Sequence, residues 1–160
     1  FFFADNDKLI CLRNDSSCDH WPNDLTLITL ADVLMFERGI TYDMFDIGHS
    51  LKTTSGGAAP YPALCGDSNA VGTSGVTTPF SDVFWVRTIL HEIGHQLFGA
   101  HTFRDCSPHN GSLMPEGAVE PGGGTTIMSY SGVCNQSHNI MPSPDLYFNS
   151  VNLDPMRTYI

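Results

Sequence analysis

The stretch of sequence that decides the fold is His91-Glu92-Ile93-Gly94-His95-Gln96-Leu97-Phe98-Gly99-Ala100-His101. Its first two histidines are four residues apart, so on a helix both imidazoles project from the same face and can share one metal ion. Glu92 is offset from His91 by about 100° around the helix axis, which suits it to accepting a proton from a metal-activated water and not to ligation. Zinc suits the pair because it takes neutral imidazole nitrogens and keeps a fourth position open for water.

His101 is the third metal ligand that the sequence favours. Gly99 is expected to end the helix in a left-handed conformation, after which the chain can turn back and present His101 from another direction. The rival ligands are the carboxylates of Glu116 and Glu120, which lie among Pro and Gly residues with no helix expected to carry them. We therefore expect His91, His95 and His101 to hold one zinc ion.

The residues around this stretch predict a helix over 81–97. Ser81 or Asp82 can cap its start after Pro79, and Gly99 follows its end. The apolar residues that recur at helical spacing are Val83, Phe84, Val86, Ile89, Leu90, Ile93 and Leu97.

The rest of the chain carries weaker patterns. Short strands are expected over 1–4 and 8–12, a helix over 25–38, extended chain over 42–49 and short strands near 63–65. A last helix is expected to begin near Asn152, with Pro155 in its first turn. The stretch Asp5-Asn6-Asp7 matches no calcium-loop spacing, so a turn is expected there and a calcium site has no support.

The composition limits both the class of protein and its partners. A chain of 160 residues is enough for one domain. It carries 17 acidic and 7 basic side chains, a net charge of −10, which disfavours nucleic acid and anionic membranes as partners. With 41% hydrophobic and 15% charged residues, wholesale disorder is not expected. No apolar run approaches the roughly 18 residues that cross a bilayer, so no membrane insertion is expected.

The five cysteines are Cys11, Cys18, Cys65, Cys106 and Cys134. No two of them form a Cys-x-x-Cys pair, which excludes a zinc-knuckle pattern. Two disulfides and one spare thiol suit an exported protein, and we expect Cys11–Cys18 and Cys106–Cys134 because short or Gly-, Pro-, Ser- and Asp-rich loops join them. Reduced, buried thiols in a cytosolic protein are the alternative. Phe1-Phe2-Phe3 is not a signal peptide, although an exported protein can have lost its signal.

A second motif follows the histidines. In Gly122-Gly123-Gly124-Thr125-Thr126-Ile127-Met128-Ser129-Tyr130, a Met precedes a Tyr by two residues in a turn-forming stretch. Together these residues resemble the metzincin zinc peptidases, whose motif His-Glu-x-x-His-x-x-Gly-x-x-His is followed by a Met-containing turn beneath the metal. The likeness is closest to bacterial secreted reprolysin-like members. Its further landmarks are the segments 45–49, 84–85, 120–122, 127–134 and 145–148.

The resemblance implies an α+β fold and a distribution of roles. The fold would be a metzincin-type catalytic domain over residues 1–160, with a twisted mixed β-sheet and active-site helix in an upper part (about 1–99) and an irregular lower part (about 100–160) carrying the Met-turn. The family's first strand and first helix would be missing. Glu92 would be the general base and acid, and Met128 a packing floor below the zinc. Tyr130 would approach the metal or stabilise the oxyanion, with packing in the turn as the alternative.

The resemblance also implies where a substrate lies. A strand near residues 58–65 would form the upper rim of the cleft, where an extended peptide adds as a further strand. Pro60 and Pro62 lack N–H donors, so this edge is expected to pair less regularly than usual.

One position departs from the family motif. Phe98 stands where the family has Gly, and Gly99 comes one residue later. Either the helix runs one residue longer and turns more sharply, or Phe98 takes a backbone conformation that costs about 1 kcal/mol or more. If neither occurs, His101 is misplaced.

These observations predict a secreted zinc endopeptidase that acts on protein or peptide substrates. The competing hypothesis is a degenerate, non-catalytic zinc-binding module of a larger secreted or surface protein. A zinc hydrolase acting on a non-peptide amide is a third. The remaining histidines are expected to be structural or solvent-facing; they include His20, His49, His109 and His138.

Overall fold

A computed structural model of the chain describes residues 39–52, 55–65, 68–75, 77, 82–109 and 114–160. In chain order they form a 3-10 helix at Tyr42–Met44, strands β1 (Ser50–Lys52), β2 (Gly56–Ala58) and β3 (Thr73–Gly75), helix α2 (Asp82–Gln96), a 3-10 helix at Pro115–Gly117 and helix α3 (Ser150–Tyr159). The strands expected within 1–12, the helix expected over 25–38 and the Cys11–Cys18 pair lie outside the described residues.

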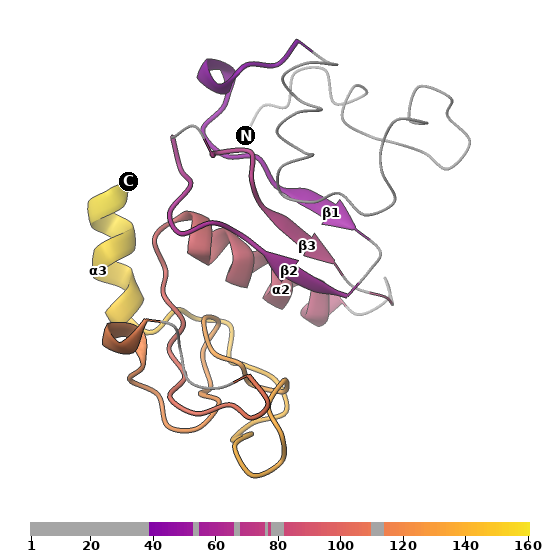
Figure 1. Ribbon diagram of the computed structural model, residues 1–160, viewed down its shortest axis with the longest axis vertical. Helices are drawn as coiled ribbons and strands as arrows, with labels where there is room; N and C mark the ends of the chain where they lie inside the picture. The colour runs from indigo at the N-terminus through magenta and orange to yellow at the C-terminus, as the bar shows by residue number, and fades with distance from the viewer. Residues whose placement is uncertain (1–38, 53–54, 66–67, 76, 78–81, 110–113) are drawn as a thin grey trace.

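The three strands form one mixed sheet in the order β1-β3-β2. β1 runs parallel to β3, with Ser50 opposite Thr73, and β2 runs antiparallel to β3, with Gly57 opposite Ser74. β3 is buried along its whole length, whereas β2 is exposed and forms one edge of the described sheet. Helix α2 lies across one face of the sheet (Figure 1). A mixed sheet combined with helices confirms the expected α+β fold.

A buried polar network joins the C-terminal end of α2 to the sheet. The fully buried amide of Gln96 donates to the carbonyl of Gly48 (3.0 Å), and its oxygen lies 2.8 Å from Nδ1 of His49. Nε2 of His49 lies 2.8 Å from the hydroxyl of Ser74 in β3. Burial lowers the pKa of His49 while the bond to Gln96 acts in the opposite direction, so the neutral ring is favoured. His49 is therefore structural, as expected.

The segment before β1 is less extended than the sequence suggests. Tyr42–Met44 is a 3-10 helix in which the N–H of Met44 donates to the carbonyl of Thr41 (2.9 Å), and a regular strand begins only at Ser50. The prediction of extended chain over 42–49 is therefore wrong for its first three residues.

The strand predicted near residues 63–65 is replaced by a turn. The N–H groups of Ala63 and Leu64 both donate to the carbonyl of Gln96, at 3.1 and 3.2 Å, and Cys65 has a positive φ of 55°. The strand of this region ends earlier, at Ala58. The two prolines at 60 and 62 account for this, because proline cannot donate to a strand ladder.

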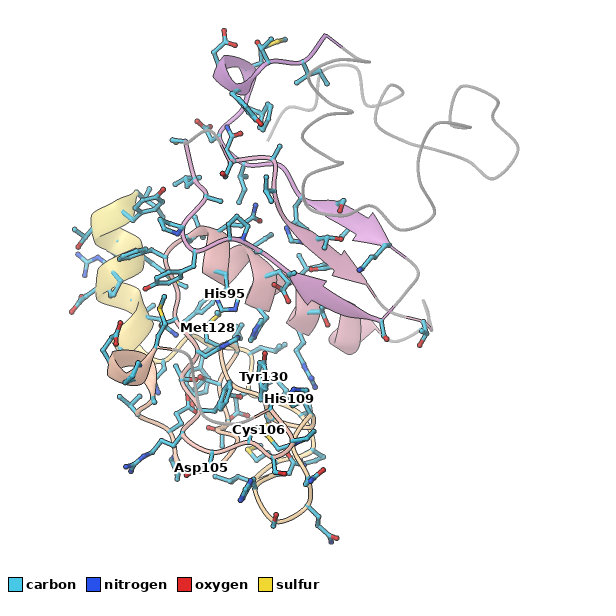
Figure 2. All side chains as sticks on the ribbon, in the orientation of Figure 1. His95, Asp105, Cys106, His109, Met128 and Tyr130 are labelled. Atoms are coloured by element: carbon cyan, nitrogen blue, oxygen red, sulfur yellow. A yellow bond between two sulfur atoms is a disulfide. The ribbon has the colours of Figure 1, made fainter. Side chains whose placement is uncertain are left out.

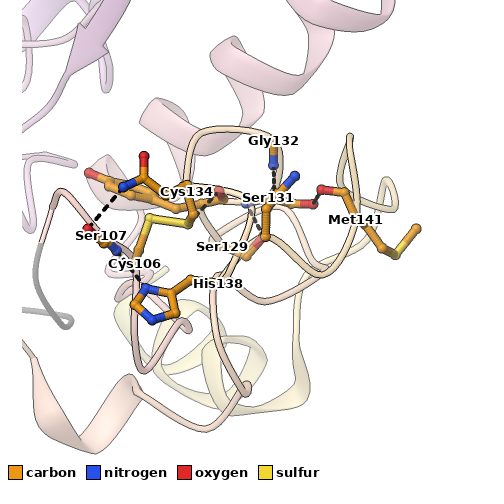
Figure 3. The surroundings of a disulfide bond; sticks show 11 residues. Cys106, Ser107, Ser129, Ser131, Gly132, Cys134, His138 and Met141 are labelled. Atoms are coloured by element: carbon orange, nitrogen blue, oxygen red, sulfur yellow. Dashed lines mark hydrogen bonds between the residues drawn. A yellow bond between two sulfur atoms is a disulfide. The ribbon is translucent and has the colours of Figure 1, made fainter.

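The chain after His101 is irregular and is held together by cross-links. Phe103 and Glu120 form an isolated parallel bridge, and Tyr130, His109 and Cys106 follow one another away from α2 (Figure 2). The disulfide Cys106–Cys134 joins the segment after His101 to the segment after the Met-turn (Figure 3). This confirms the second expected pair, and Cys65 is free.

A buried carboxylate organises the approach to the Met-turn. Glu120 is 6% exposed and accepts hydrogen bonds from the N–H and hydroxyl groups of Thr125 and Thr126 and from the Asn149 amide. Burial alone would raise the pKa of Glu120, but the bonds from Thr126 and Thr125 outweigh it and leave that pKa below its usual value. The carboxylate therefore stays ionised and ties five donor groups together.

Helix α3 begins earlier than expected, at Ser150. The side chain of Asn149 caps it by accepting from the N–H of Val151 (3.1 Å), and Pro155 lies inside the helix instead of in its first turn. Asn152 is buried and accepts from the N–H of Ala100 (3.1 Å), which attaches α3 to the chain just before His101. Within the described residues, no helix combines the length and the apolar character that crossing a bilayer requires.

Candidate active site

Helix α2 ends in a Schellman motif whose left-handed residue is Phe98. The N–H of Phe98 bonds to the carbonyl of His95 (3.0 Å) and the N–H of Gly99 to that of Gly94 (2.7 Å), the two bonds of this motif. Phe98 has φ 74°, so the prediction that Gly99 takes the left-handed conformation is wrong. Of the two alternatives for Phe98, the structure has the strained backbone, which costs an ordinary residue roughly 1–2 kcal/mol. Glycine is required at position 99 for lack of space, because a Cβ there would collide with Met156 and with the carbonyl of Gly94.

The turn brings the three predicted histidines together. Nε2 of His101 lies 3.1 Å from Nε2 of His91 and 3.0 Å from Nε2 of His95. One ligand atom from each of the three lies within 4.8 Å of the others. Ligand nitrogens around a tetrahedral zinc, with Zn–N of about 2.0–2.1 Å, are about 3.3 Å apart. The arrangement therefore fits a zinc ion, and the displaced glycine has not moved His101 away.

Backbone carbonyls set the orientation of two of these rings. Nδ1 of His91 lies 2.7 Å from the carbonyl of Ile127, and Nδ1 of His95 lies 2.8 Å from the carbonyl of Gly99. Because a carbonyl only accepts, each Nδ1 carries the proton and each Nε2 is left with a free lone pair. Such second-sphere partners hold the ring in the tautomer that a metal needs.

The site favours neutral imidazoles. The pKa of His91 is lowered to about 3, mainly by burial and secondarily by the charge of His95. The hydrogen bond to the carbonyl of Ile127 acts in the opposite direction. Burial, then the charges of His95 and His91, lowers the pKa of His101 to about 2. Burial also lowers the pKa of His95. All three rings are therefore neutral at neutral pH, so none of them has to lose a proton before it binds the metal.

Glu92 is buried beside the histidines without joining their ligand set. Its side chain is 7% exposed, and burial raises its pKa to about 7 while the charge of Lys52 acts to lower it. A carboxyl group poised near neutrality is suited to taking up and releasing protons. Strand β2 covers it closely, because a Cβ on Gly57 would lie 2.5 Å from Oε1 of Glu92.

Met128 packs against α2 at Gly94, between the two helical histidines. Its side chain is fully buried, and a Cβ on Gly94 would collide with its sulfur. The carbonyl of Met128 accepts from the N–H of Thr102 (3.1 Å), one residue after the third histidine. Figure 2 places Met128 between His95 and the lower segments. Gly94, between the two helical histidines, is thus the space into which the methionine packs.

Tyr130 stands next to the ligand cluster. Its ring is stacked on Phe103 with centroids 4.3 Å apart, meets the ring of His101 edge-on at 4.7 Å and lies 5.9 Å from that of His91. Burial, then the charge of Glu92, raises the pKa of Tyr130, so its hydroxyl keeps its proton and can donate a hydrogen bond. The stack holds this hydroxyl-bearing ring in place.

A cavity of about 220 Å³ opens over this cluster. It is lined by residues of β2 and the segment after it, of α2 and of the chain beyond: Gly57, Ala58, Ala59, His91, Glu92, His95, His101 and Tyr130. The rim strand predicted over 58–65 is thus β2, Gly56–Ala58, and only its last residue was included in the prediction. The signal for Gly57 was the run of small residues over 55–59, which leaves room for a buried side chain beneath.

The remaining candidates lie outside the cluster. Glu120 is engaged below the Met-turn, and Glu116 is exposed in the 3-10 helix Pro115–Gly117. Nδ1 of His138 accepts from the N–H of Ser107 (2.9 Å), whereas His109 is exposed with its ring 5.4 Å from that of Tyr130. His20 lies outside the described residues. A larger apolar cavity, about 380 Å³, lies beside Phe98 and α3 and contains none of the three histidines.

Comparison with known proteins agrees with this geometry. A family model described as "Metallo-peptidase family M12B Reprolysin-like" matches residues 9–156. No curated protein sequence matches the chain. The matched range spans nearly the whole chain and includes the three histidines, Glu92, Met128 and Tyr130. The chain therefore belongs to the reprolysin-like metallopeptidases of family M12B.

Proposed function

We propose that this chain is a zinc-dependent endopeptidase in which His91, His95 and His101 hold one zinc ion. The observation that carries the proposal is the convergence of three Nε2 atoms beside a buried carboxyl group in an open cavity. When bound, zinc supplies Lewis acidity, which makes water nucleophilic at neutral pH and polarises a carbonyl group.

Glu92 is the general base and acid in this proposal. Its carboxylate accepts the proton of the attacking water and returns it to the amine that leaves when the peptide bond breaks. Two observations support this role: the carboxyl group lines the cavity, and its pKa of about 7 suits both the uptake and the release of a proton. A purely structural metal site would have no use for a buried acid at this position.

Tyr130 is the oxyanion donor in this proposal. Its ring borders the cavity and the ring of His101, and its raised pKa keeps the hydroxyl protonated and able to donate. A donor that is fixed before the reaction stabilises developing negative charge without reorganisation. The stack on Phe103 supplies that fixation.

The substrate class in this proposal is an extended polypeptide. β2 is exposed, lies at the edge of the described sheet and borders the cavity through Gly57 and Ala58. An edge strand presents unpaired backbone N–H and C=O groups, to which an extended chain can add by main-chain hydrogen bonds. Pro60 limits this pairing to a short segment. Binding through the backbone explains how varied protein sequences could be accepted.

We also propose that the protein acts outside the cell. The disulfide Cys106–Cys134 ties down the segment that leads from His101 to the lower part, and such cross-links persist in oxidising compartments. The net charge of −10 agrees with protein substrates better than with nucleic acid.

The test is metal-dependent cleavage of an unfolded protein substrate. The chain would be stripped of metal with a chelator, assayed, reloaded with one equivalent of zinc and assayed again, with the fragments identified by mass spectrometry. We expect internal cuts only in the zinc-loaded sample. Tight zinc binding without cleavage would support the non-catalytic module instead, and hydrolysis restricted to small amides would support the non-peptide hydrolase.

A further inference from the structure

The turn that ends α2 holds a bulky residue in a backbone conformation that normally belongs to glycine. Phe98 has φ 74°, and the Schellman bonds of Phe98 and Gly99 depend on that value. Among the described residues, only Phe98 and Cys65 combine a side chain with a positive φ. Something in the surroundings of Phe98 must therefore offset a conformation that the residue would leave if it were free.

The ring of Phe98 is packed between two tyrosine rings. It is stacked on Tyr61 with centroids 4.7 Å apart and planes 14° from parallel. On its other neighbour, Tyr159, the centroids are 5.6 Å apart and the planes 20° from parallel. Aromatic pairs at these separations stabilise beyond the apolar area that they bury. This aromatic stack, Tyr61–Phe98–Tyr159, forms with Phe98 in the left-handed conformation.

The two tyrosines belong to different parts of the chain. Tyr159 is at the end of α3, and its hydroxyl donates to the carbonyl of Leu64 (2.8 Å). Tyr61 lies in the segment after β2. In this segment the N–H groups of Ala63 and Leu64 donate to the carbonyl of Gln96 at the end of α2. The stack therefore joins α3 and the segment after β2 to the C-terminal end of α2. Figure 1 shows α3 beside that end of α2.

The same turn orients two metal ligands. The carbonyl of Gly99 holds Nδ1 of His95 (2.8 Å), and the N–H of Ala100 is held by Asn152 of α3 (3.1 Å). His101 is the next residue. A change in the backbone of Phe98 would move Gly99 and Ala100 and, with them, the Nε2 atoms of both histidines.

We infer that Phe98 is a positioning residue for His95 and His101, and that its stack with Tyr61 and Tyr159 does what the glycine of the family motif does elsewhere, namely make a left-handed turn accessible. α3 is thereby part of the metal site although it carries no ligand. The inference rests on the zinc site of the proposed function and not on peptidase activity, so it can be tested by metal binding alone.

The first experiment compares Tyr159→Ala with Tyr159→Phe in the full chain. Zinc dissociation constants would be measured by competition with a chromophoric chelator, and cobalt(II) would be substituted to record the visible absorption bands that report ligand geometry. Tyr159→Ala removes one of the two rings, so zinc must itself supply part of what holds the turn in shape. We expect weaker binding, up to the roughly 30-fold that the full left-handed cost gives as a ratio of constants, and altered cobalt bands. Tyr159→Phe keeps the ring and should bind as the parent does.

The second experiment repeats the change in a Phe98→Gly background. Glycine adopts the left-handed turn without support from a stack. We therefore expect Phe98→Gly to bind zinc about as tightly as the parent, and Tyr159→Ala to have no further effect once Phe98 is gone. Phe98→Ala keeps the strained backbone and loses both stacking contacts, so it should lose at least as much affinity as Tyr159→Ala. Tyr61→Ala removes the other ring and gives the same comparison if Tyr159→Ala does not fold, as judged by circular dichroism.

Three outcomes would overturn the inference. One is parent-like zinc affinity and cobalt spectra in both Tyr→Ala variants. Another is an equal loss from Tyr159→Ala with Phe98 and with Gly at that position, because the tyrosine would then act independently of the turn. The third is a parent chain that binds no zinc, which would remove the proposed metal site as well. Zinc binding with no peptidase activity would contradict only the proposed function.

Discussion

At the scale of single residues, the hydroxyl of Tyr130 separates a catalytic from a packing role. The ring packs on Phe103 and His101 whether or not it carries a hydroxyl. Tyr130→Phe should therefore leave the fold and the zinc affinity unchanged. If the hydroxyl donates to the oxyanion, kcat should fall about 10- to 100-fold with KM nearly constant.

Steady-state kinetics on an internally quenched peptide would measure the effect of Tyr130→Phe. Tyr147→Phe is the matched control, because Tyr147 is 54% exposed and does not line the cavity. A kcat for Tyr130→Phe equal to that of the control would assign Tyr130 to packing in the turn.

The second prediction at the scale of single residues concerns Glu120 and the free energy of unfolding. Glu120→Gln replaces an acceptor of five donor groups with a group that itself donates, so the free energy of unfolding should fall by about 2 kcal/mol or more. The folded pKa of Glu120 lies below its ordinary value of 4.5. Its contribution is thus fully present above pH 4.5 and is lost as pH falls through the folded pKa.

Urea denaturation of the parent and of Glu120→Gln across the acid range would measure this difference. It should shrink below pH 4.5, the ordinary pKa of the group. The exposed Glu116 offers a matched control in Glu116→Gln. If the two variants lose equal stability, Glu120 does not organise the turn.

At the scale of elements, the contact between β2 and α2 sets the position of Glu92, the proposed general base. A Cβ on Gly57 would lie 2.5 Å from Oε1 and 2.6 Å from Cγ of Glu92. Gly57→Ala should therefore displace the carboxyl group and lower kcat/KM at least about tenfold, because catalysis depends on the placement of the base. The zinc affinity should not change, since no ligand is touched.

Gly56→Ala is the control for Gly57→Ala. Gly56 is in the same strand and has open space within 4 Å, although its φ of 90° strains an alanine. It therefore reports the cost of disturbing β2 without touching Glu92. Equal losses in the two variants would mean that strand stability, and not the position of Glu92, governs activity.

The elements differ in how far the sequence could predict them. α2 follows a long apolar periodicity, and its predicted range of 81–97 differs from Asp82–Gln96 by one residue at each end. The strands are three residues each, and β2 and β3 are built from Gly, Ala, Ser and Thr, so no alternation of apolar residues marks them. The sequence predicts the start of α3 two residues too late. Prolines usually stand in the first turn of a helix, which places the start near Asn152, whereas the structure has Asn149 as the cap and Pro155 inside the helix.

The site was more predictable than the sheet, because its motif is local. The separation of His91 from His95 places them on one helix face in any α-helix. Whether His101 would reach them was open, because that depends on the backbone of Phe98. The answer lies in Tyr61 and Tyr159, which are far from Phe98 in sequence and close in space. Contacts of this kind leave no periodic signal.

At the scale of the whole molecule, the metal-free chain should be sensitive to acid. The three clustered histidines, His91, His95 and His101, have pKa values lowered from 6.5, so folding keeps them neutral, and they contribute stability that is lost as pH falls below 6.5. Glu92 acts in the opposite sense, because its pKa is raised from 4.5 to about 7 and the folded state holds a proton that the unfolded state releases.

Between pH 4.5 and 6.5 these four groups together should bind more protons in the unfolded than in the folded state, because the pKa values of three histidines are lowered and that of one carboxyl group is raised. The free energy of unfolding of the chelator-treated chain should therefore fall as pH is lowered through this range. Zinc should raise that free energy at each pH in the range, because it binds the neutral rings of the folded chain. Denaturant titrations at several pH values, with and without zinc, would measure both slopes. A flat profile for the metal-free chain would contradict the buried, neutral cluster.

The activity of Glu92→Gln, measured beside the parent with each loaded with one zinc ion, tests most directly whether this cluster is a peptidase active site. Glutamine keeps the size of the side chain but cannot accept the proton. We expect kcat on an unfolded protein substrate to fall by about 10²- to 10⁴-fold while zinc affinity and substrate binding are retained. Cleavage by Glu92→Gln within a few-fold of the parent, or a zinc-loaded parent that cuts nothing, would contradict the claim that this cluster is a peptidase active site.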